Sequence, residues 1–512
     1  MKTRETWGTR AGFIMAAAGS AIGLGNIWRF PGEAYEFGGG AFLVPYLIAI
    51  LTAGIPLLLL EYTIGRRYRS GPPSAFRMLS PRAEGIGWWQ NAIAFFLATF
   101  YAVIIAWAVC YVFFAVTRSW GEDSAMFFGV DFLAASEDPL TFGEYRPTIM
   151  AALIGVWVLV LVIMLGGVRK GVELANRICI PLLVVLFGVI VIRAVTLDGA
   201  LDGLNAFFTP QWDTITALET GPEIWLAAYG QVFFSLSIGM GTMIAYSSYL
   251  KKKAELSTTA VTVAFANSSF ELMAGIGVFS ILGFMSAQSG TAIGELVGVG
   301  GGVAFVTFPA ILNEMPGGNF VGVLFFASLV VAGVSSIISM VIVPFSSVED
   351  RFGWSRKKTV AVIGIPMALF SILIYPTTNG SSMVDAVDFA VSGYGLVLGG
   401  LATIVLAFAT GKIRVLAAEA NRTSVLKLGW VWYVCLALTT IMLTLVLILN
   451  VKGQIEDLSD PEIANELIYI NWGVGGAMIL FGLVMTAVMY RRPLPVANSE
   501  DGESVDSGSA TA

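Results

Sequence analysis

Long apolar stretches separated by short polar segments recur along the whole chain. Each stretch is about 20 residues or longer, which is the length at which an α-helix crosses a lipid bilayer. The alternation of apolar and polar residues that marks a membrane β-barrel is not seen, so we predict an all-α polytopic membrane protein. The pattern places twelve spans at residues 10–34, 39–65, 88–117, 147–166, 172–195, 222–250, 255–287, 319–346, 359–376, 383–410, 428–450 and 468–490.

Charged residues are scarce and unevenly placed between these spans. The chain is 56% hydrophobic and 12% charged, more apolar than a soluble protein of 512 residues could bury. If the N-terminus lies inside, 23 of the 29 Lys and Arg residues fall on inner segments and four on outer segments. This bias predicts a multi-pass protein with both termini in the cytoplasm.

Composition narrows the function further. The chain has no His, which removes imidazole-based acid–base and metal chemistry, so we expect no enzyme. The net charge of −6 gives no reason to expect nucleic acid as a partner. Residues 1–9 are predicted to form a cytoplasmic N-terminus, and the polar, acidic residues 491–512 are typical of a disordered cytoplasmic tail.

Two predicted spans contain helix breakers at mid-membrane depth. The first holds GSAIGLGNIWRFP (19–31), and the sixth holds FFSLSIGMG (233–241). Glycines also occur where helices simply pack closely, which is the alternative for either span alone. Because the breaks are five spans apart, they predict two inverted repeats, residues 10–195 and 222–410, with spans 11 and 12 (428–490) outside them.

Unwound backbone within a membrane leaves N–H and C=O groups that need other partners. Carbonyl groups can bind a small cation, and the N-terminal end of the next helix can bind a carboxylate. Neutral side-chain oxygens suit Na⁺ better than a transition metal, although a serine in a span often only bonds back to its own helix. The candidates are Asn26, Ser235, Ser237, Asn267, Ser335 and Ser336.

Six motifs, in order, resemble the neurotransmitter:sodium symporter family in its bacterial LeuT-type branch of Na⁺-coupled amino-acid transporters. They are GSAIGLGNIWRFP, GGGAFLVPY (38–46), EYTIGR (61–66), GQVFFSLSIGMG (230–241), ANSSFE (266–271) and AGVSS (332–336). The resemblance implies a LeuT-type 5+5 inverted repeat with spans 1 and 6 unwound at mid-membrane. The short outer loop 118–146 lacks the paired cysteines of animal relatives, which implies a prokaryotic member in the inner (plasma) membrane.

The resemblance also implies two co-transported sodium ions and a substrate site beside them. The first sodium site would use Ala21, Asn26, Ser235 and Asn267. The second would use Gly19, Ile22, Ala332, Ser335 and Ser336. The substrate site would use Ala21, Leu24, Gly25, Leu97, Tyr101, Phe234, Ser235, Ser237, Met240, Ser336 and Met340.

Gates would close this site from both sides. The outer gate would pair Arg29 with Asp388, with Gln231 beside them. The inner gate would use Arg4, Trp7, Tyr249 and Asp350. Two acidic residues would support the site: Glu61 would tie the two breaks together, and Glu271 stands where chloride-dependent relatives carry Ser and would replace chloride.

The expected function is Na⁺-coupled symport of a neutral, hydrophobic L-amino acid into the cell by alternating access, independent of chloride and with proton antiport as a further hypothesis. Gly23 favours an amino acid, because monoamine transporters of the family carry an Asp there in place of a substrate carboxylate. The alternatives are a β- or γ-amino acid or taurine as the substrate, or an amino-acid-gated sensor or channel. The expected partners are the amino acid, Na⁺ and the lipid bilayer, and the oligomeric state is not predicted.

Overall fold

The structure, a computed structural model, describes residues 4–136, 143–217, 221–296, 302–458, 465–489 and 492–493. These described residues form helices and loops without a β-strand of any length. From residue 494 onward, the tail that we predict to be disordered lies outside the described residues.

Ten spans of the described chain are helices long and apolar enough to cross a membrane. Four of them contain a π-helical turn, labelled η. The ten are α3–η1–α4 (Leu43–Ala49, Ile50–Gly54, Ile55–Tyr68), α6 (Glu84–Thr117), α8 (Pro147–Leu165), η3–α9 (Val168–Glu173, Leu174–Ala194), α14 (Ser257–Ser289), α17 (Gly318–Phe352), α18–η5–α19 (Arg356–Thr359, Val360–Gly364, Ile365–Ile374), α20–η6–α21 (Gly380–Asp388, Phe389–Gly395, Leu396–Ala409), α23 (Trp430–Asp457) and α24 (Asn465–Met489).

The first and sixth predicted spans are broken helices. In span 1, α1 (Arg10–Ala21) and α2 (Gly25–Glu36) are bent by 69° across a three-residue break. In span 6, α12 (Gly221–Ser235) and α13 (Thr242–Ser247) are separated by residues 236–241. The predicted all-α membrane fold with two unwound spans is therefore confirmed.

Short helices in the connections are not predicted by the hydrophobic pattern, because none is longer than nine residues. They are α5 (Pro72–Leu79), α7 (Ser124–Met126), η2 (Phe127–Phe132), α10 (Ala200–Phe208), α11 (Trp212–Thr216), α15 (Ile293–Leu296), η4 (Val303–Thr307), α16 (Phe308–Glu314) and α22 (Ile413–Asn421). The long helices also extend beyond several predicted ends: α6 begins at Glu84, and α17 continues to Phe352.

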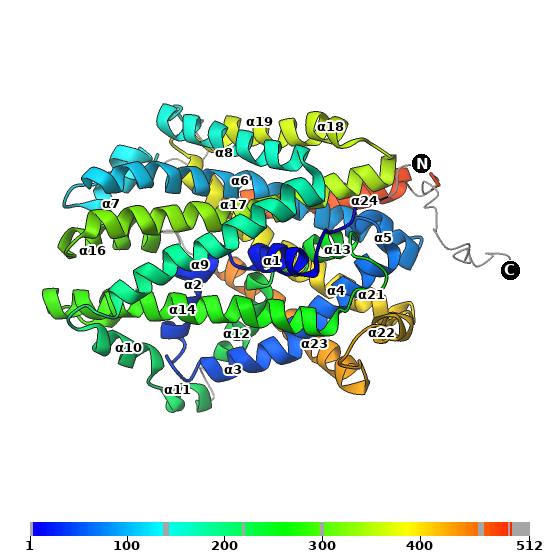
Figure 1. Cartoon of the computed structure of the whole chain (residues 1–512), viewed down its shortest axis with the longest axis horizontal. Coiled ribbons are helices and arrows are strands. Elements are labelled where there is room, and N and C mark those ends of the chain that lie inside the picture. Colours follow the sequence, from blue (N-terminus) through cyan, green and yellow to red (C-terminus); the bar gives the residue numbers. More distant parts are fainter. Residues whose placement is uncertain are drawn as a thin grey trace.

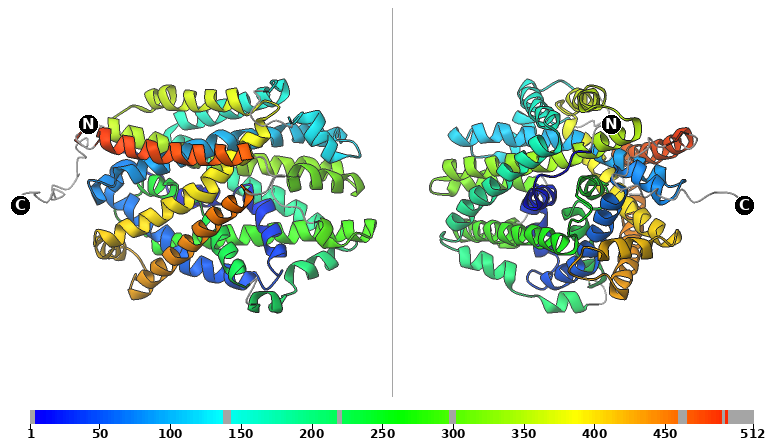
Figure 2. Two further views of the ribbon diagram at one scale, coloured as in Figure 1. Left: turned by 180° about the vertical axis from the view of Figure 1, so that it is seen from behind. Right: turned by 45° about the vertical axis from the view of Figure 1, so that its right-hand side comes forward.

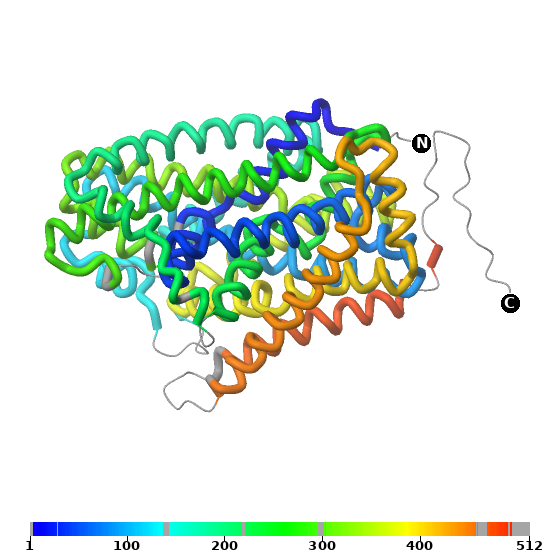
Figure 3. Tube along the Cα trace, turned by 90° about the horizontal axis from the view of Figure 1, so that it is seen from below, coloured from blue at the N-terminus to red at the C-terminus, as the bar shows by residue number. Residues whose placement is uncertain are grey.

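The broken spans lie inside the bundle and the last two helices lie outside it. Figure 1 shows α1 near the middle, with α9 and α14 on its two sides, and the second view of Figure 2 shows α1 surrounded by other helices. α6 and α17 pack extensively against each other, and most of their residues are buried. α23 and α24 run along the edge (Figure 3), and many of their apolar side chains are exposed, as contact with lipid requires.

The N-terminal segment and the end of α24 lie at the same end of the molecule (Figure 1). Two neighbouring residues near the end of α17 join them. The Arg351 guanidinium donates to the Pro493 carbonyl (2.9 Å), and the Asp350 carboxylate pairs with Arg4 (2.5 Å). Both described ends of the chain therefore lie on one side of the bundle.

Candidate functional site

The break in span 1 exposes the last carbonyl groups of α1. A helix leaves its final four carbonyls without helical partners, and in α1 two of them are taken up by other spans. The Ser20 carbonyl accepts from the Ser237 hydroxyl (2.8 Å), and the Gly19 carbonyl accepts from the Ser336 hydroxyl (3.3 Å). The end of α1 is thus held by both the sixth span and α17.

The break in span 6 is built on left-handed backbone. Ser237, Gly239 and Gly241 have φ values of 53°, 88° and 80°. Only glycine adopts such values freely, so Ser237 holds a disfavoured conformation that places its hydroxyl on the Ser20 carbonyl. The Gly239 N–H, left free by the break, donates to the buried Glu61 carboxylate (2.9 Å). Glu61 therefore supports the sixth span, while the direct link between the two breaks is Ser237–Ser20, which the sequence did not reveal.

The residues predicted for the first sodium site lie together. Asn26 accepts from the Gly23 N–H (2.8 Å) and donates to the Asn267 side-chain carbonyl (2.8 Å). Asn267 in turn donates to the Ser235 hydroxyl (2.5 Å). All three side chains are at most 5% exposed. The fourth predicted ligand, Ala21, is the last residue of α1, and its role stays a prediction. Span 1, span 6 and α14 thus meet through neutral oxygens.

Glu271 lies at the edge of this network, one helical turn from Asn267 on α14. Its carboxylate accepts from the Asn267 amide (3.2 Å), the Gln231 amide (2.7 Å) and the Tyr46 hydroxyl. Gln231, predicted beside the outer gate, reaches Glu271 from α12. Its place at the gate stays a prediction. Tyr46 is a functional neighbour that the sequence analysis missed.

The residues predicted for the second sodium site also converge. The Ser336 hydroxyl lies 3.3 Å from the Gly19 carbonyl and 3.5 Å from the Ile22 carbonyl. One residue earlier on α17, the Ser335 hydroxyl donates to the Ala332 carbonyl (2.8 Å). The carbonyl and hydroxyl oxygens gathered here are neutral, and oxygen donors suit a hard cation.

The predicted substrate residues surround the glycines of span 1. The Leu24 N–H donates to the Tyr101 hydroxyl (3.0 Å). A Cβ atom at Gly23 would lie 3.0 Å from both the Tyr101 and the Ser336 hydroxyls, and one at Gly25 would lie 3.0 Å from the Phe234 ring. A larger residue at either position would require these neighbours to move by a few tenths of an ångström. The other predicted pocket residues, Leu97, Met240 and Met340, are buried, and their role as pocket walls stays a prediction.

The residues predicted for the inner gate are in contact. Arg4 pairs with Asp350 and donates to the Ser248 hydroxyl (2.6 Å), and its guanidinium lies 4.5 Å from the centre of the Tyr249 ring. The Trp7 indole donates to the Tyr246 carbonyl (2.8 Å). The N-terminal segment is therefore fixed across α13 and α17.

The residues predicted for the outer gate are not paired with each other. Arg29 pairs with Glu33 (3.1 Å), one turn along α2, and its guanidinium lies 4.8 Å from the centre of the Phe234 ring. The Asp388 carboxylate accepts from the Ser392 hydroxyl (2.7 Å). In this structure the residues of the predicted inner gate contact one another. Arg29 and Asp388, predicted for the outer gate, instead bond to residues one turn away on their own helices.

A carboxylate between the membrane spans anchors the N-terminal end of α14. Glu255 accepts from the Ser257 hydroxyl (2.5 Å), the Thr258 N–H (3.0 Å) and the Val425 N–H (3.3 Å), and pairs with Arg10 (3.2 Å). Burial opposes its ionisation, but the hydrogen bonds from Ser257 and Thr258 outweigh burial and lower the pKa of Glu255 to about 2.

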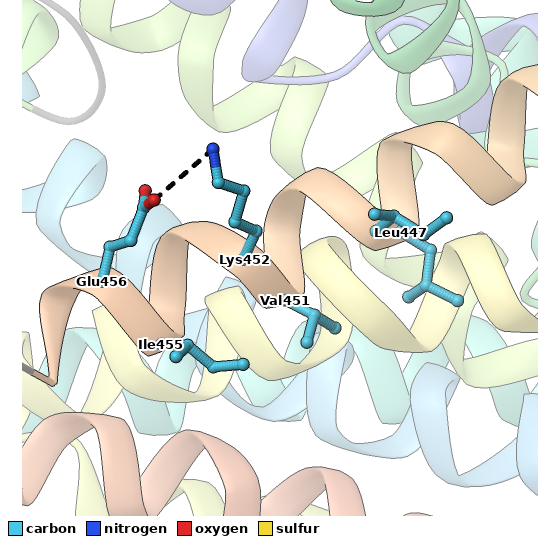
Figure 4. Close-up of a pocket in the computed structure, with 6 residues that line it drawn as sticks. Leu447, Val451, Lys452, Ile455 and Glu456 are labelled. Atoms are coloured by element: carbon cyan, nitrogen blue, oxygen red, sulfur yellow. Dashed lines mark ion pairs between the residues drawn. The ribbon is translucent and has the colours of Figure 1, made fainter.

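A surface hollow on α23 lies apart from this site. It is lined by Leu447, Ile448, Val451, Lys452, Ile455 and Glu456, and Figure 4 shows the ion pair between Lys452 and Glu456 (3.4 Å) at its rim. Its residues come from a single peripheral helix and include none of the predicted site residues.

An all-α membrane bundle in which two broken spans meet around neutral oxygens has the architecture of a secondary transporter. The sequence model described as "Sodium:neurotransmitter symporter family" matches residues 4–128 and 121–495. The chain belongs to this family, and it is a multi-pass, sodium-dependent membrane transporter rather than an enzyme.

Individual relatives agree with this assignment. An uncharacterised sodium-dependent transporter of Methanocaldococcus jannaschii is 39% identical, over 88% of this chain and 91% of the relative. The sodium-dependent serotonin transporter of Drosophila melanogaster is 28% identical, over 94% and 82%. The crystal structure of MhsT in complex with L-phenylalanine matches with a TM-score of 0.73 and 33% identity, covering 87% of this chain and 99% of MhsT.

Proposed function

We propose that this protein carries a neutral, hydrophobic L-amino acid into a prokaryotic cell together with two sodium ions, by alternating access across the plasma membrane. The observation that carries the proposal is that residue 23 is an uncharged glycine against the Tyr101 and Ser336 hydroxyls, each 3.0 Å from where a Cβ atom would lie. Two sodium ions and a substrate ammonium leave excess positive charge at the breaks, and the neutral oxygens there do not balance it. A substrate carboxylate beside Gly23 would balance it.

Hydrogen-bond donors for that carboxylate are present at the same place. The Tyr101 hydroxyl and the Leu24 N–H lie together (3.0 Å), next to the N-terminus of the twelve-residue helix α2. A helix N-terminus favours a negative charge. MhsT, a relative of known structure, was crystallised in complex with L-phenylalanine. This complex supports a substrate with a large apolar side chain.

Sodium ions would occupy the two groups of oxygens at the breaks. The first ion would bind Ala21, Asn26, Ser235 and Asn267, and the second would bind Gly19, Ile22, Ala332, Ser335 and Ser336. Each inward sodium gains about 2.3 kcal/mol per 100 mV of membrane potential and about 1.4 kcal/mol from a tenfold gradient. Two ions would supply about 7 kcal/mol, enough for a concentration ratio of about 10⁵.

Transport would not need chloride, because Glu271 supplies a fixed carboxylate one hydrogen bond from Asn267. In the return step, after sodium has left, protonation of the same carboxylate would remove an uncompensated buried charge. That proton would be released when sodium binds again, which gives proton antiport.

Binding of tritiated L-phenylalanine to the purified full-length protein tests the substrate class. We expect binding in NaCl and none in KCl, with displacement by apolar L-amino acids. Stronger displacement by γ-aminobutyrate, β-alanine or taurine would favour the alternative substrate class. No binding and no displacement by any of the twenty amino acids would refute an amino-acid site.

A sodium gradient across proteoliposomes tests the transport step. A carrier accumulates labelled amino acid above the external concentration, and a channel or sensor does not. The experiment needs inward- and outward-directed sodium gradients. In coupled symport, net movement of the amino acid reverses when the sodium gradient is reversed.

A further inference from the structure

The tenth predicted span contains a π-helical turn directly after Asp388, a residue predicted for the outer gate. The turn, η6, covers Phe389–Gly395 and joins α20 to α21. Its backbone bonds span one residue more than those of an α-helix, as in the bond from the Leu396 N–H to the Val391 carbonyl. The proposed function gives this turn no role, although π-turns inside helices often lie at functional sites.

Two side chains from other helices bind carbonyl groups of the turn. The Asn450 amide of α23 donates to the Gly393 carbonyl (2.8 Å), and the Trp89 indole of α6 donates to the Gly395 carbonyl (3.1 Å). A side-chain donor that reaches a helix carbonyl replaces part of what the backbone ladder supplies, so both contacts favour an irregular turn. Trp89 belongs to the helix that also carries Tyr101, whereas Asn450 belongs to a peripheral helix.

The residues of the turn themselves give the α-helix little advantage. The sequence FAVSGYG (389–395) contains two glycines, and glycine weakens an α-helix. A Cβ atom at Gly393 would lie 3.1 Å from the Phe389 ring, and one at Gly395 would lie 3.1 Å from the Ile93 side chain. A single hydrogen bond from another helix can therefore decide between the π and the α form.

The form of the turn decides where Asp388 points. A π-turn holds about one residue more than an α-turn, so conversion to an α-helix rotates α20 relative to α21 by one residue, about 100°. With the turn in its π form, the Asp388 carboxylate accepts from the Ser392 hydroxyl (2.7 Å). Arg29 pairs instead with Glu33 (3.1 Å). The two charges of the predicted outer gate thus have other partners while the turn is π-helical.

We propose that Asn450 is a positioning residue of the outer gate, which holds the π-turn and so keeps Asp388 away from Arg29. Release of the Gly393 carbonyl lets the turn become α-helical, and the rotation brings Asp388 to Arg29 and closes the site from outside. This inference rests on the proposed function, since it assumes that the site alternates between outward- and inward-facing states. The peripheral helix α23 thereby acts on a gate that it does not line.

Labelling of a cysteine in the outer part of the site measures the state of this gate. Gly230→Cys is the reporter, because Gly230 lies one turn before Phe234 on α12 and a Cβ atom there meets open space. The reporter is placed in full-length protein in which Ala replaces the native cysteines, Cys110, Cys179 and Cys435. A methanethiosulfonate reagent is added in NaCl without amino acid, and the rate of labelling is measured.

Asn450→Leu should slow labelling at least fivefold, because the turn then favours the α form and the gate closes. Asn450→Gln keeps the amide donor and should label within twofold of the parent. Ser392→Ala removes the hydroxyl that holds Asp388 within its own span, so it should slow labelling at least threefold. In an Asp388→Asn background no ion pair with Arg29 can form, and there Asn450→Leu should change the rate less than twofold.

Thr444→Val is the matched control on the same helix. The Thr444 hydroxyl donates to the Thr440 carbonyl of α23 (2.7 Å), so this variant loses a polar group of α23 without losing the bond to η6. It should label at the parent rate.

Four results would overturn the inference. The first is unchanged or faster labelling in Asn450→Leu, or in Ser392→Ala should Asn450→Leu fail to fold. The second is equal slowing by Asn450→Gln, because the amide donor would then not be the cause. Slow labelling of Thr444→Val, or an effect of Asn450→Leu that persists without the Asp388 carboxylate, would point to disturbed packing of α23. Labelling does not require transport, so a parent protein without sodium-driven amino-acid uptake would refute the proposed function by a separate measurement.

Discussion

Replacing Gly23 by Asp should abolish amino-acid binding through charge and not through crowding. A Cβ atom at residue 23 lies 3.0 Å from the Tyr101 and Ser336 hydroxyls, so an Asp side chain points to the place proposed for the substrate carboxylate. Two carboxylates about 4 Å apart repel each other by about 4 kcal/mol at an effective dielectric constant of about 20. This corresponds to an affinity loss of about a thousandfold.

The matched control is Gly23→Ala, which adds the crowded atom without the charge. The two hydroxyl groups can move by a few tenths of an ångström, so we expect the affinity for L-phenylalanine to fall less than tenfold in Gly23→Ala. The assay is displacement of tritiated L-phenylalanine in saturating NaCl, with phenethylamine, which lacks the carboxylate, as a second competitor. Phenethylamine should compete better than phenylalanine for any site that remains in Gly23→Asp.

Two results would refute this reasoning. Equal losses of phenylalanine affinity in Gly23→Ala and Gly23→Asp would show that lack of space, and not charge, causes the loss. Unchanged phenylalanine binding in Gly23→Asp would show that the substrate carboxylate lies elsewhere.

Three further predictions concern the network and the N-terminal end of α14. Asn26→Ala should weaken sodium-dependent amino-acid binding at least a hundredfold, because it removes a proposed sodium ligand. It also leaves the Gly23 N–H and the Asn267 oxygen unpaired, each at a cost of about 1–3 kcal/mol. A titration of amino-acid binding with sodium measures the loss. Glu271→Ser should slow chloride-free uptake at least tenfold, and added chloride should restore it. Glu255 should make the fold acid-labile: its pKa is lowered from its usual 4.5 to about 2, so its stabilisation is complete above pH 4.5 and is lost as the pH falls through about 2. Glu255→Gln should flatten thermal stability over that range.

Each of these has its own counter-result. Parent-like sodium affinity in Asn26→Ala would remove that residue from the first site. Chloride-free uptake by Glu271→Ser at the parent rate would show that the carboxylate does not replace an anion. Glu122→Gln, at an exposed residue, is the control for acid lability, and an identical effect of the two Gln variants would contradict a special role for Glu255.

Hydrophobic patterning predicted the ten spans that are continuous long helices, because such helices must match the bilayer. The glycines within spans 1 and 6 also predicted the two breaks, because glycine destabilises a continuous helix. The ends of spans were less accurate: α17 runs past the predicted residue 346 to Phe352, because Asp350 and Arg351 gain partners there that composition does not show.

Side-chain partners were predictable only where a family motif carried them. Asn26, Ser235 and Asn267 come together as the resemblance implies, although no spacing rule relates residues 26 and 267. The hydrogen bond from Gln231 to Glu271 was not predicted, because no spacing rule relates residues 231 and 271. Tyr46 was missed, since a polar residue in a span looks the same in sequence whether it faces its own helix or another one. Ser20 was missed because it takes part through its backbone carbonyl, which every residue carries.

The hydrogen bond from Ser237 to Ser20 bears on leakage. A transporter wastes its ion gradient whenever one half of the site opens without the other, since sodium can then slip through alone. Here one hydroxyl, held in a conformation that serine rarely adopts, fastens the unwound part of the sixth span to the end of α1. This contact holds the two halves of the site together, so we expect the tightness of coupling to depend on a serine that is also a predicted substrate residue.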